Sequence, residues 1–141
     1  MGNHAVSDRT LQKYWRLAVL ALHHNRCIIC GKTRQPEDLE CHHIIKRGHR
    51  VTRHDVKNGV PVCITPIEID GQITTCHKIA HTKVGQRIID GRLGASHCEY
   101  LDEREKVMIK DYKNALSYST KELEKYELEK LKKVIGNYQE D

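Results

Sequence analysis

The chain has 141 residues, of which 38% are hydrophobic, with a single tryptophan and no phenylalanine. This length fits one domain, or a small core with appended helices, and leaves little room for two independent cores. The apolar run at residues 17–22 is too short to span a membrane, so no membrane partner is expected. A core with so few large apolar side chains would benefit from a bound metal.

The net charge of +5 is unevenly distributed along the chain. Residues 1–99 hold 15 Lys and Arg against 9 Asp and Glu, whereas residues 100–141 hold 9 against 10. The positive surplus of the first segment favours a polyanionic partner, although many basic proteins bind none. Charge alone therefore leaves a nucleic-acid partner open.

Cysteine and histidine are clustered rather than scattered. All ten histidines precede residue 98, and five of the six cysteines lie between residues 27 and 76. An even cysteine count is compatible with disulfides, but the first residues lack the hydrophobic region of a signal peptide. We expect a reducing, intracellular and cytoplasmic setting, which a bacterial or phage-encoded protein would fit.

The first half of the chain mixes helix and strand. A cap at Ser7 or Asp8 predicts a helix to about residue 24, whose apolar residues recur at helical spacing. Residues 27–31 are typical of a tight knuckle, since Cys-x-x-Cys-Gly turns both sulfurs toward one centre. Strand-like segments follow at 39–45 and 60–64, and they are separated by a basic polar loop.

An alternating segment at residues 67–74 is centred on Asp-Gly, a strong hairpin signal. Such a hairpin would bring Cys63 and Cys76 together despite the twelve residues between them. A helix is predicted from Cys76 to about residue 84, and the glycines at 85, 91 and 94 are expected to loosen the chain after it.

The last third is predicted to form two helices, at residues 99–116 and 120–138, and residues 136–141 are expected to fray. The second helix opens with a capping box at residues 119–122 and carries an apolar stripe formed by Leu128, Leu131, Ile135 and Tyr138. We expect an α+β fold with a core at residues 1–98 and a helical extension at 99–141. The stripe would pack on that core or at a homodimer interface.

Four thiols form two pairs along the chain: Cys27 and Cys30, then Cys63 and Cys76. Four thiolates are the set required for a closed, structural zinc site. The second spacing is longer than the usual Cys-x2-Cys, so a site that recruits a histidine, or no zinc at all, stays open. Cys41 and Cys98 are expected to be buried or free thiols.

Two histidine pairs could divide the work of a second metal site. His42 and His43 are adjacent and on a strand would point to opposite faces, whereas His77 and His81 share one helix face. If His42 and His77 hold a divalent ion, His43 is free to take a proton from water. Taken singly, each of these histidines could instead be an ordinary solvated or hydrogen-bonded side chain.

These motifs closely resemble the HNH family of ββα-metal nucleases over about residues 13–84. Trp15-Arg16, Cys-Ile-Ile-Cys-Gly, Leu-Glu-Cys-His-His-Ile-Ile, Asn-Gly-Val-Pro-Val-Cys and Cys-His-x-x-x-His occur in the family order. The resemblance implies that His43 is the general base, and that Asn58 fixes the loop between the strands. It also implies metal ligation by His42 and His77, and that His81 either ligates the metal or contacts the phosphate in catalysis.

Two positions depart from the family pattern. Residues 64–75 form an insertion before the last cysteine, and His42 stands where many members have Asp. A nitrogen-rich site accepts Mn²⁺, Ni²⁺ or Zn²⁺ as well as Mg²⁺. The resemblance also places a basic loop beside the metal, where it would neutralise DNA phosphates: Lys46, Arg47, Arg50, Arg53 and Lys57.

The resemblance implies a metal-dependent endonuclease that hydrolyses phosphodiester bonds in double-stranded DNA and leaves 5′-phosphate and 3′-hydroxyl ends. It would nick one strand, or cut both strands as a dimer. A non-catalytic zinc module that binds nucleic acid would explain the cysteines and the charge, but not the order of the histidines and Asn58. A zinc-stabilised protein-interaction module would explain still less.

Overall fold

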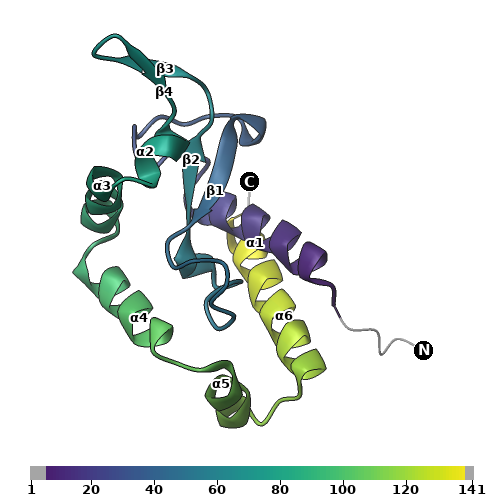
Figure 1. Cartoon of the computed structure of the whole chain (residues 1–141). Helices are drawn as coiled ribbons and strands as arrows, with labels where there is room; N and C mark the ends of the chain where they lie inside the picture. The colour runs from purple at the N-terminus through teal and green to yellow at the C-terminus, as the bar shows by residue number, and fades with distance from the viewer. Residues whose placement is uncertain (1–5, 139–141) are drawn as a thin grey trace.

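A computed structural model describes residues 6–138 and has a mixed α+β fold. Its centre is a two-stranded antiparallel sheet in which β1 (Leu39–His43) pairs with β2 (Gly59–Cys63), as Figure 1 shows. Leu39 lies opposite Cys63 and His43 opposite Gly59. Every residue of β2 is buried. Strand β2 is therefore covered by neighbouring elements, whereas β1 is only partly covered, with Glu40 exposed.

Helix α1 (Asp8–Leu22) packs against this sheet through the buried face predicted from the apolar spacing. Ser7 is the N-cap, because its hydroxyl accepts a hydrogen bond from the Thr10 amide. The helix ends two residues earlier than predicted, since His24 and Asn25 adopt positive φ values. A Cβ on Gly59 would lie 2.5 Å from the Trp15 ring, so glycine at this position lets α1 approach β2 closely.

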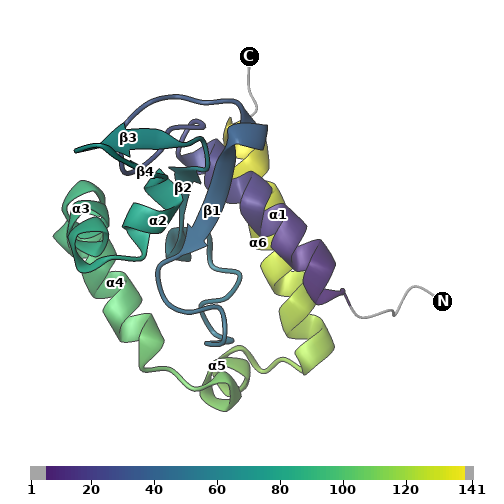
Figure 2. The same ribbon diagram turned by 45° about the horizontal axis from the view of Figure 1, so that its top comes forward.

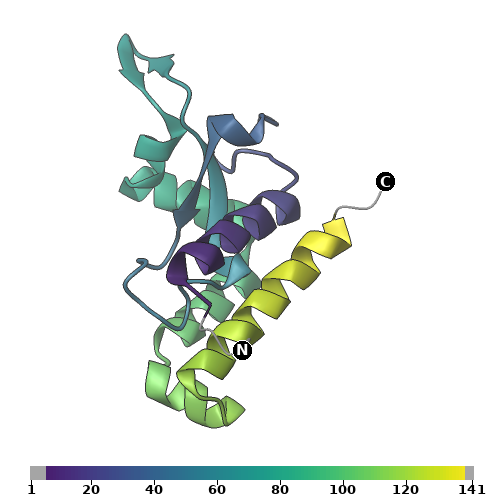
Figure 3. The ribbon, with the colours of Figure 1, turned by 90° about the vertical axis from the view of Figure 1, so that its right-hand side faces the viewer.

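The hairpin predicted at residues 67–74 is confirmed. Strand β3 (Ile67–Ile69) pairs with β4 (Gln72–Thr74) across a turn at Asp70 and Gly71, which have φ values of 51° and 79°. Two positive φ values in a two-residue turn match the twist of the strands. Figures 1 and 3 show the hairpin extending away from the rest of the protein.

The single helix predicted over residues 76–84 is wrong. Helix α2 (Cys76–Ala80) ends early, and α3 (Lys83–Leu93) begins after the Thr82 cap. A Cβ on Gly85 would overlap the Ile79 carbonyl, so this glycine permits the two helices to pack closely rather than loosening the chain. Gly91 lies inside α3, and Gly94 ends it with φ of 92°.

The single helix predicted at 99–116 is also wrong, because α4 (Ala95–Glu105) and α5 (Ile109–Leu116) are separated by an extended residue, Met108. The last helix, α6 (Thr120–Tyr138), has the predicted bounds. Its capping box is formed, since the Glu122 carboxylate accepts from the Ser119 amide and the Ser119 hydroxyl accepts from the Glu122 amide.

Helix α6 packs lengthwise on α1 (Figures 2 and 3). Leu131 and Ile135 join Leu11, Trp15 and Val19 in one buried cluster. The apolar stripe thus packs on the core within one chain, and the residues that favoured a homodimer interface are largely covered. Tyr138, at the end of the stripe, stays 45% exposed.

None of the helices in the described part of the chain combines the length and apolar character that crossing a bilayer requires. Helix α6 continues through Gly136, where fraying was expected. The remaining tail, at 139–141, lies outside the described residues, as do residues 1–5, where no signal peptide was expected.

Candidate metal centres

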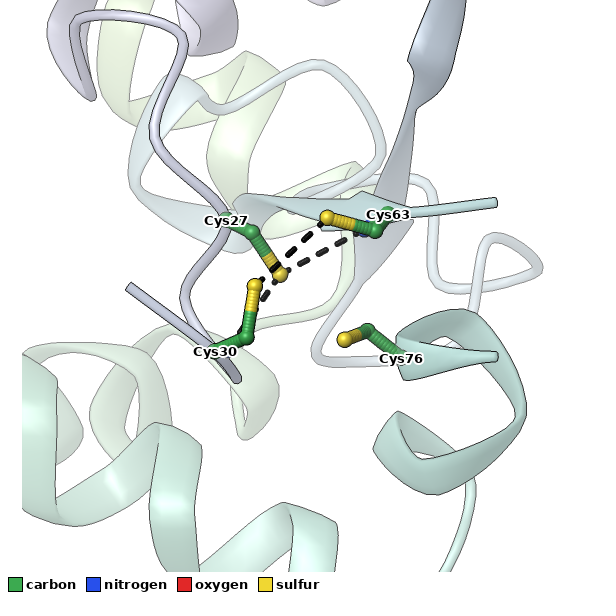
Figure 4. Close-up of side chains that lie close together, drawn as sticks. All are labelled: Cys27, Cys30, Cys63 and Cys76. Carbon is green, nitrogen blue, oxygen red and sulfur yellow. Dashed lines mark hydrogen bonds between the residues drawn. The ribbon is translucent and has the colours of Figure 1, made fainter. Parts of the chain in front are cut away.

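Four cysteines from three parts of the fold converge on one point (Figure 4). Cys27 and Cys30 come from the knuckle after α1, Cys63 ends β2 and Cys76 begins α2. Their four sulfurs all lie within 4.8 Å of one another, and the Cys30 and Cys63 sulfurs are 3.6 Å apart. Zinc–sulfur bonds of about 2.3 Å place tetrahedral sulfurs roughly 3.8 Å apart. The predicted set of four thiols can therefore hold a structural metal ion.

The backbone around Cys27 supports this arrangement. The amides of Cys30 and Cys63 approach the Cys27 sulfur at 3.5 and 3.4 Å. Gly31 has φ of 78° and donates to the Cys27 carbonyl, which closes the knuckle. The β3–β4 hairpin closes the long segment between Cys63 and Cys76, so the insertion does not separate these thiols.

Burial changes the pKa values of these thiols. It raises the pKa of Cys63 to about 11 and raises that of Cys76 further. At Cys30 burial also raises the pKa, but hydrogen bonds from the Lys32 amide and neighbouring thiols outweigh it, so the net shift is downward. A metal at this site would replace protons on the buried thiols.

The remaining cysteines lie outside this group. The Cys41 sulfur contacts Arg16, and burial raises the pKa of Cys41 to about 12. The Cys98 sulfur contacts the Asp90 carbonyl on the preceding helix. Neither belongs to a cluster of ligand atoms among the described residues.

Three histidines form a second group of ligand atoms: His42, His77 and His81. Each contributes one ring nitrogen, and these three nitrogens all lie within 4.8 Å of one another. The Nε2 atoms of His77 and His81 are 3.4 Å apart. Metal–nitrogen bonds of about 2.1 Å place two tetrahedral ligands roughly 3.4 Å apart, so this spacing suits a shared ion. His81, for which ligation and phosphate contact were both open, thus lies beside His42 and His77.

The three-histidine group is more exposed than the cysteine group, in which every member except Cys30 is buried. His81 is exposed, whereas His42 and His77 are half-buried. Burial, followed by the charges of His81 and His77, lowers the pKa of His42 to about 4. Its imidazole is therefore neutral at neutral pH and can donate a lone pair to a cation. Three protein ligands leave further coordination positions free.

His43 follows His42 on β1 but contacts the other side of the sheet. Its ring stacks on Trp15 with centroids 3.9 Å apart, and its Nε2 lies 3.0 Å from the Arg53 carbonyl oxygen. A carbonyl only accepts hydrogen bonds, so Nε2 carries the proton and Nδ1 has the free lone pair. Burial lowers the pKa of His43 and so favours the neutral form of the ring.

Asn58 closes the β1–β2 loop, residues 44–58. Its Oδ1 accepts from the Ile45 amide at 2.7 Å, and its Nδ2 donates to the carbonyls of Ile45 and Thr52 at 3.1 Å. The side chain is completely buried. These bonds span thirteen and six residues of sequence, so one amide fixes both the start and the middle of the loop.

The five basic residues expected at DNA have different surroundings. Arg47 and Arg53 both contact the Asp8 carboxylate, at 2.9 and 3.3 Å. Arg50 points inward to Glu127 and is 21% exposed. Lys46 is exposed, and the Lys57 ammonium lies 4.5 Å from the Tyr100 ring centre.

Sequence reasoning missed the acidic partners of the loop, Asp8 and Glu127, and the buried His54 between them. One signal was available for Glu127. It lies four residues after Leu123 and four before Leu131, so it occupies the same row as buried leucines. An acid in such a row requires a buried partner.

No family model matches the chain, and no curated protein or solved structure matches it either.

Proposed function

We propose that this protein is a metal-dependent HNH endonuclease that hydrolyses phosphodiester bonds in DNA and leaves 5′-phosphate and 3′-hydroxyl ends. In this proposal the sheet β1–β2 and helix α2 form the ββα-metal finger. The four cysteines hold a structural zinc ion that keeps the knuckle, the sheet and α2 together. The three histidines hold the catalytic divalent ion.

The observation that carries the proposal is that two adjacent residues of β1 have different surroundings. His42 lies in the three-histidine group, and His43 is held separately by the Trp15 ring and the Arg53 carbonyl. No described residue hydrogen-bonds His43 Nδ1, so its lone pair is available to water. A metal site beside an oriented, neutral base is the arrangement that hydrolysis of a phosphodiester requires.

A divalent ion bound by His42, His77 and His81 would offset the negative charge that develops on the phosphate and the leaving oxygen. His43 would accept a proton from the attacking water at Nδ1. The Arg53 carbonyl keeps Nε2 protonated, so the ring presents one fixed tautomer to that water. Trp15 limits rotation of the ring by stacking on its face.

Lys46, Arg47 and Arg53 are proposed to contact phosphates beside the cleaved bond, with Lys57 farther along the loop. Such contacts are independent of base sequence and weaken with salt. Arg50 is assigned to the fold instead, because both its terminal nitrogens bind the buried Glu127 carboxylate.

The test is cleavage of supercoiled plasmid DNA by the purified full chain. Nicking is expected with Mg²⁺, Mn²⁺, Ni²⁺ or Zn²⁺ and is expected to stop with EDTA. His43→Ala should reduce nicking by at least about 10²-fold, because it removes the proposed general base. Exposed His24 lies in the turn after α1 and outside both ligand groups, so His24→Ala is the matched control and should cleave as fast as the wild type.

Wild-type cleavage by a folded His43→Ala protein would contradict the assignment of the base. DNA binding by the wild type without cleavage under any of these metals would instead support the non-catalytic zinc module.

A further inference from the structure

The middle of the β1–β2 loop is tied to the last helix by a buried ion pair. Arg50 donates from its two terminal nitrogens to the two carboxylate oxygens of Glu127, at 3.0 and 2.8 Å. Glu127 is 5% exposed and Arg50 is 21% exposed. A bidentate contact of this kind fixes the orientation of the two side chains as well as the distance between them.

Glu127 occupies a position where a leucine would be expected from the apolar row of α6. Leu123, Leu131 and Ile135 on the same side of the helix are all buried. A carboxylate in such a row is costly unless it is paired and hydrogen-bonded. Its presence thus requires an explanation beyond packing, and a role in holding the loop supplies one.

A second residue of the loop also contacts Glu127. The His54 side chain is completely buried, with Nδ1 3.7 Å from the Glu127 carboxylate and Nε2 3.2 Å from Asp8 at the start of α1. Within the described residues neither nitrogen has a partner at good hydrogen-bond geometry. His54 therefore sits between one carboxylate from α6 and one from α1.

Arg50 and His54 flank Arg53, whose carbonyl receives the hydrogen bond of His43 Nε2. Figures 1 and 2 show this part of the loop between α6 on one side and α4 on the other. Glu127 thus contacts one loop residue before Arg53 in the sequence, Arg50, and one after it, His54. The Arg53 carbonyl between them is the hydrogen-bond partner of His43 Nε2.

We propose that Glu127 is a positioning residue for His43: through Arg50 and His54 it holds the loop so that the Arg53 carbonyl keeps His43 in the Nε2-protonated form. The role of His43 as a base rests on the proposed function, whereas the link from Glu127 to the His43 ring does not. In this proposal helix α6 helps to orient His43 through Glu127, although it contributes no residue that contacts the reacting atoms.

The decisive measurement is the tautomer of His43, read from the ring ¹⁵N chemical shifts of the zinc-loaded full chain. Spectra are recorded at about pH 8, above the usual histidine pKa of about 6.5, so that the ring is neutral. The wild type is expected to show the Nε2-protonated form. Glu127→Gln should produce a mixture of both tautomers, because the carbonyl is no longer held in place.

Two further variants separate this effect from a general loss of folding. Glu129→Gln changes an exposed glutamate on the same helix and is the matched control, so its His43 spectrum should equal that of the wild type. The double variant Arg50→Met, Glu127→Leu replaces the ion pair by apolar side chains, an exchange that often preserves stability. It should fold and still show mixed tautomers.

Where the wild type cleaves DNA, Glu127→Gln should lower the maximal nicking rate by roughly 10- to 100-fold with little change in KM, since DNA contacts are kept. Glu127→Asp, which restores the charge on a shorter side chain, should recover part of that rate. If the wild type does not cleave DNA but the tautomer shifts, the proposed function fails and the positioning role stands. If the folded Glu127→Gln and double variants both keep the wild-type tautomer, the positioning role is wrong.

Discussion

The indole of Trp15 and the imidazole of His43 stack nearly parallel, with centroids 3.9 Å apart and planes inclined by 7°. Trp15 is completely buried, and its Nε1 donates to the Asp55 carbonyl at 2.9 Å. One side chain of α1 therefore contacts both the proposed base and the end of the β1–β2 loop. Core packing and the orientation of His43 depend on the same residue.

Trp15→Phe should lower both stability and cleavage. The smaller ring loses the hydrogen bond to Asp55 and leaves unfilled space in the core, which together cost about 2 to 4 kcal/mol in free energy of unfolding. His43 would also lose part of the surface on which it rests, so nicking should slow. Urea unfolding followed by circular dichroism measures the first effect, and the plasmid assay measures the second.

Tyr14→Phe is the matched control, because Tyr14 neighbours Trp15 in sequence and lies outside the stack. Its free energy of unfolding should change by less than about 0.5 kcal/mol. A Trp15→Phe protein as stable and as active as the wild type would show that the stack is dispensable.

Elements governed by local backbone chemistry were predictable from the sequence. The Asp70-Gly71 turn and the Ser119-Glu122 capping box depend on residues within four positions of one another, and both are formed. The helix breaks near residues 81 and 108 were missed. At the first break, the close contact between Gly85 and the Ile79 backbone is made across the junction and leaves no mark in the apolar spacing.

The cysteine group was predictable because chemistry restricts which residues can share a zinc ion, and the hairpin explains how the long spacing closes. The grouping of His81 with His42 was only partly predictable, since strand and helix patterns do not give their relative placement. The Arg50–Glu127 pair joins residues 77 positions apart. Such pairs result from tertiary packing, so the sequence indicates only that Glu127 lies in an apolar row and does not identify its partner.

The four-cysteine site makes a prediction about folding. Cys63→Ser should lower zinc content and unfold or loosen the protein, since zinc binding and folding are coupled in small metal sites. Cys30→Ser should do the same. Bound zinc is measured by elemental analysis, and thermal unfolding is measured by circular dichroism.

Cys98→Ser is the control for this experiment, because Cys98 lies outside the four-sulfur group. It should keep the wild-type zinc content and the wild-type melting temperature. Unchanged zinc content and stability in Cys63→Ser would refute a structural metal at this site.

The placement of His81 predicts a role in metal binding rather than in phosphate contact alone. His81→Ala should weaken binding of the second divalent ion by at least about tenfold, because one of three nitrogen ligands is lost. The zinc of the cysteine site should stay bound. Calorimetric titration of Ni²⁺ or Mn²⁺ into the zinc-loaded chain measures this affinity without requiring cleavage.

His49→Ala offers a comparison, because His49 contacts the Arg104 carbonyl and lies outside the three-histidine group. Its second-ion affinity should equal that of the wild type. Wild-type metal affinity with slower nicking in His81→Ala would reassign His81 to the phosphate.

The Glu127 carboxylate makes the free energy of unfolding depend on pH. Burial alone would raise the pKa of Glu127, but contacts with His54 and Arg50 outweigh burial and lower it below the ordinary value of 4.5. A group with a lowered folded-state pKa contributes stability above its unfolded pKa and loses it as the pH falls through the folded value. Tyr112 from α5 also faces this carboxylate, and Asp8 reaches it through His54.

At about pH 7, Glu127→Gln should therefore be about 3 kcal/mol less stable than the wild type, because Arg50 is left without a charged partner. The difference should shrink as the pH falls below the unfolded-state value of 4.5 and through the lowered folded-state pKa of Glu127, because the wild-type carboxylate then becomes protonated. Urea unfolding of both proteins across this range measures it. Asp8→Asn should show a smaller difference, since Asp8 is 45% exposed and solvent screens its ion pairs. A Glu127→Gln deficit that stays constant from neutral to acid pH would mean that the charge of Glu127 contributes nothing to stability.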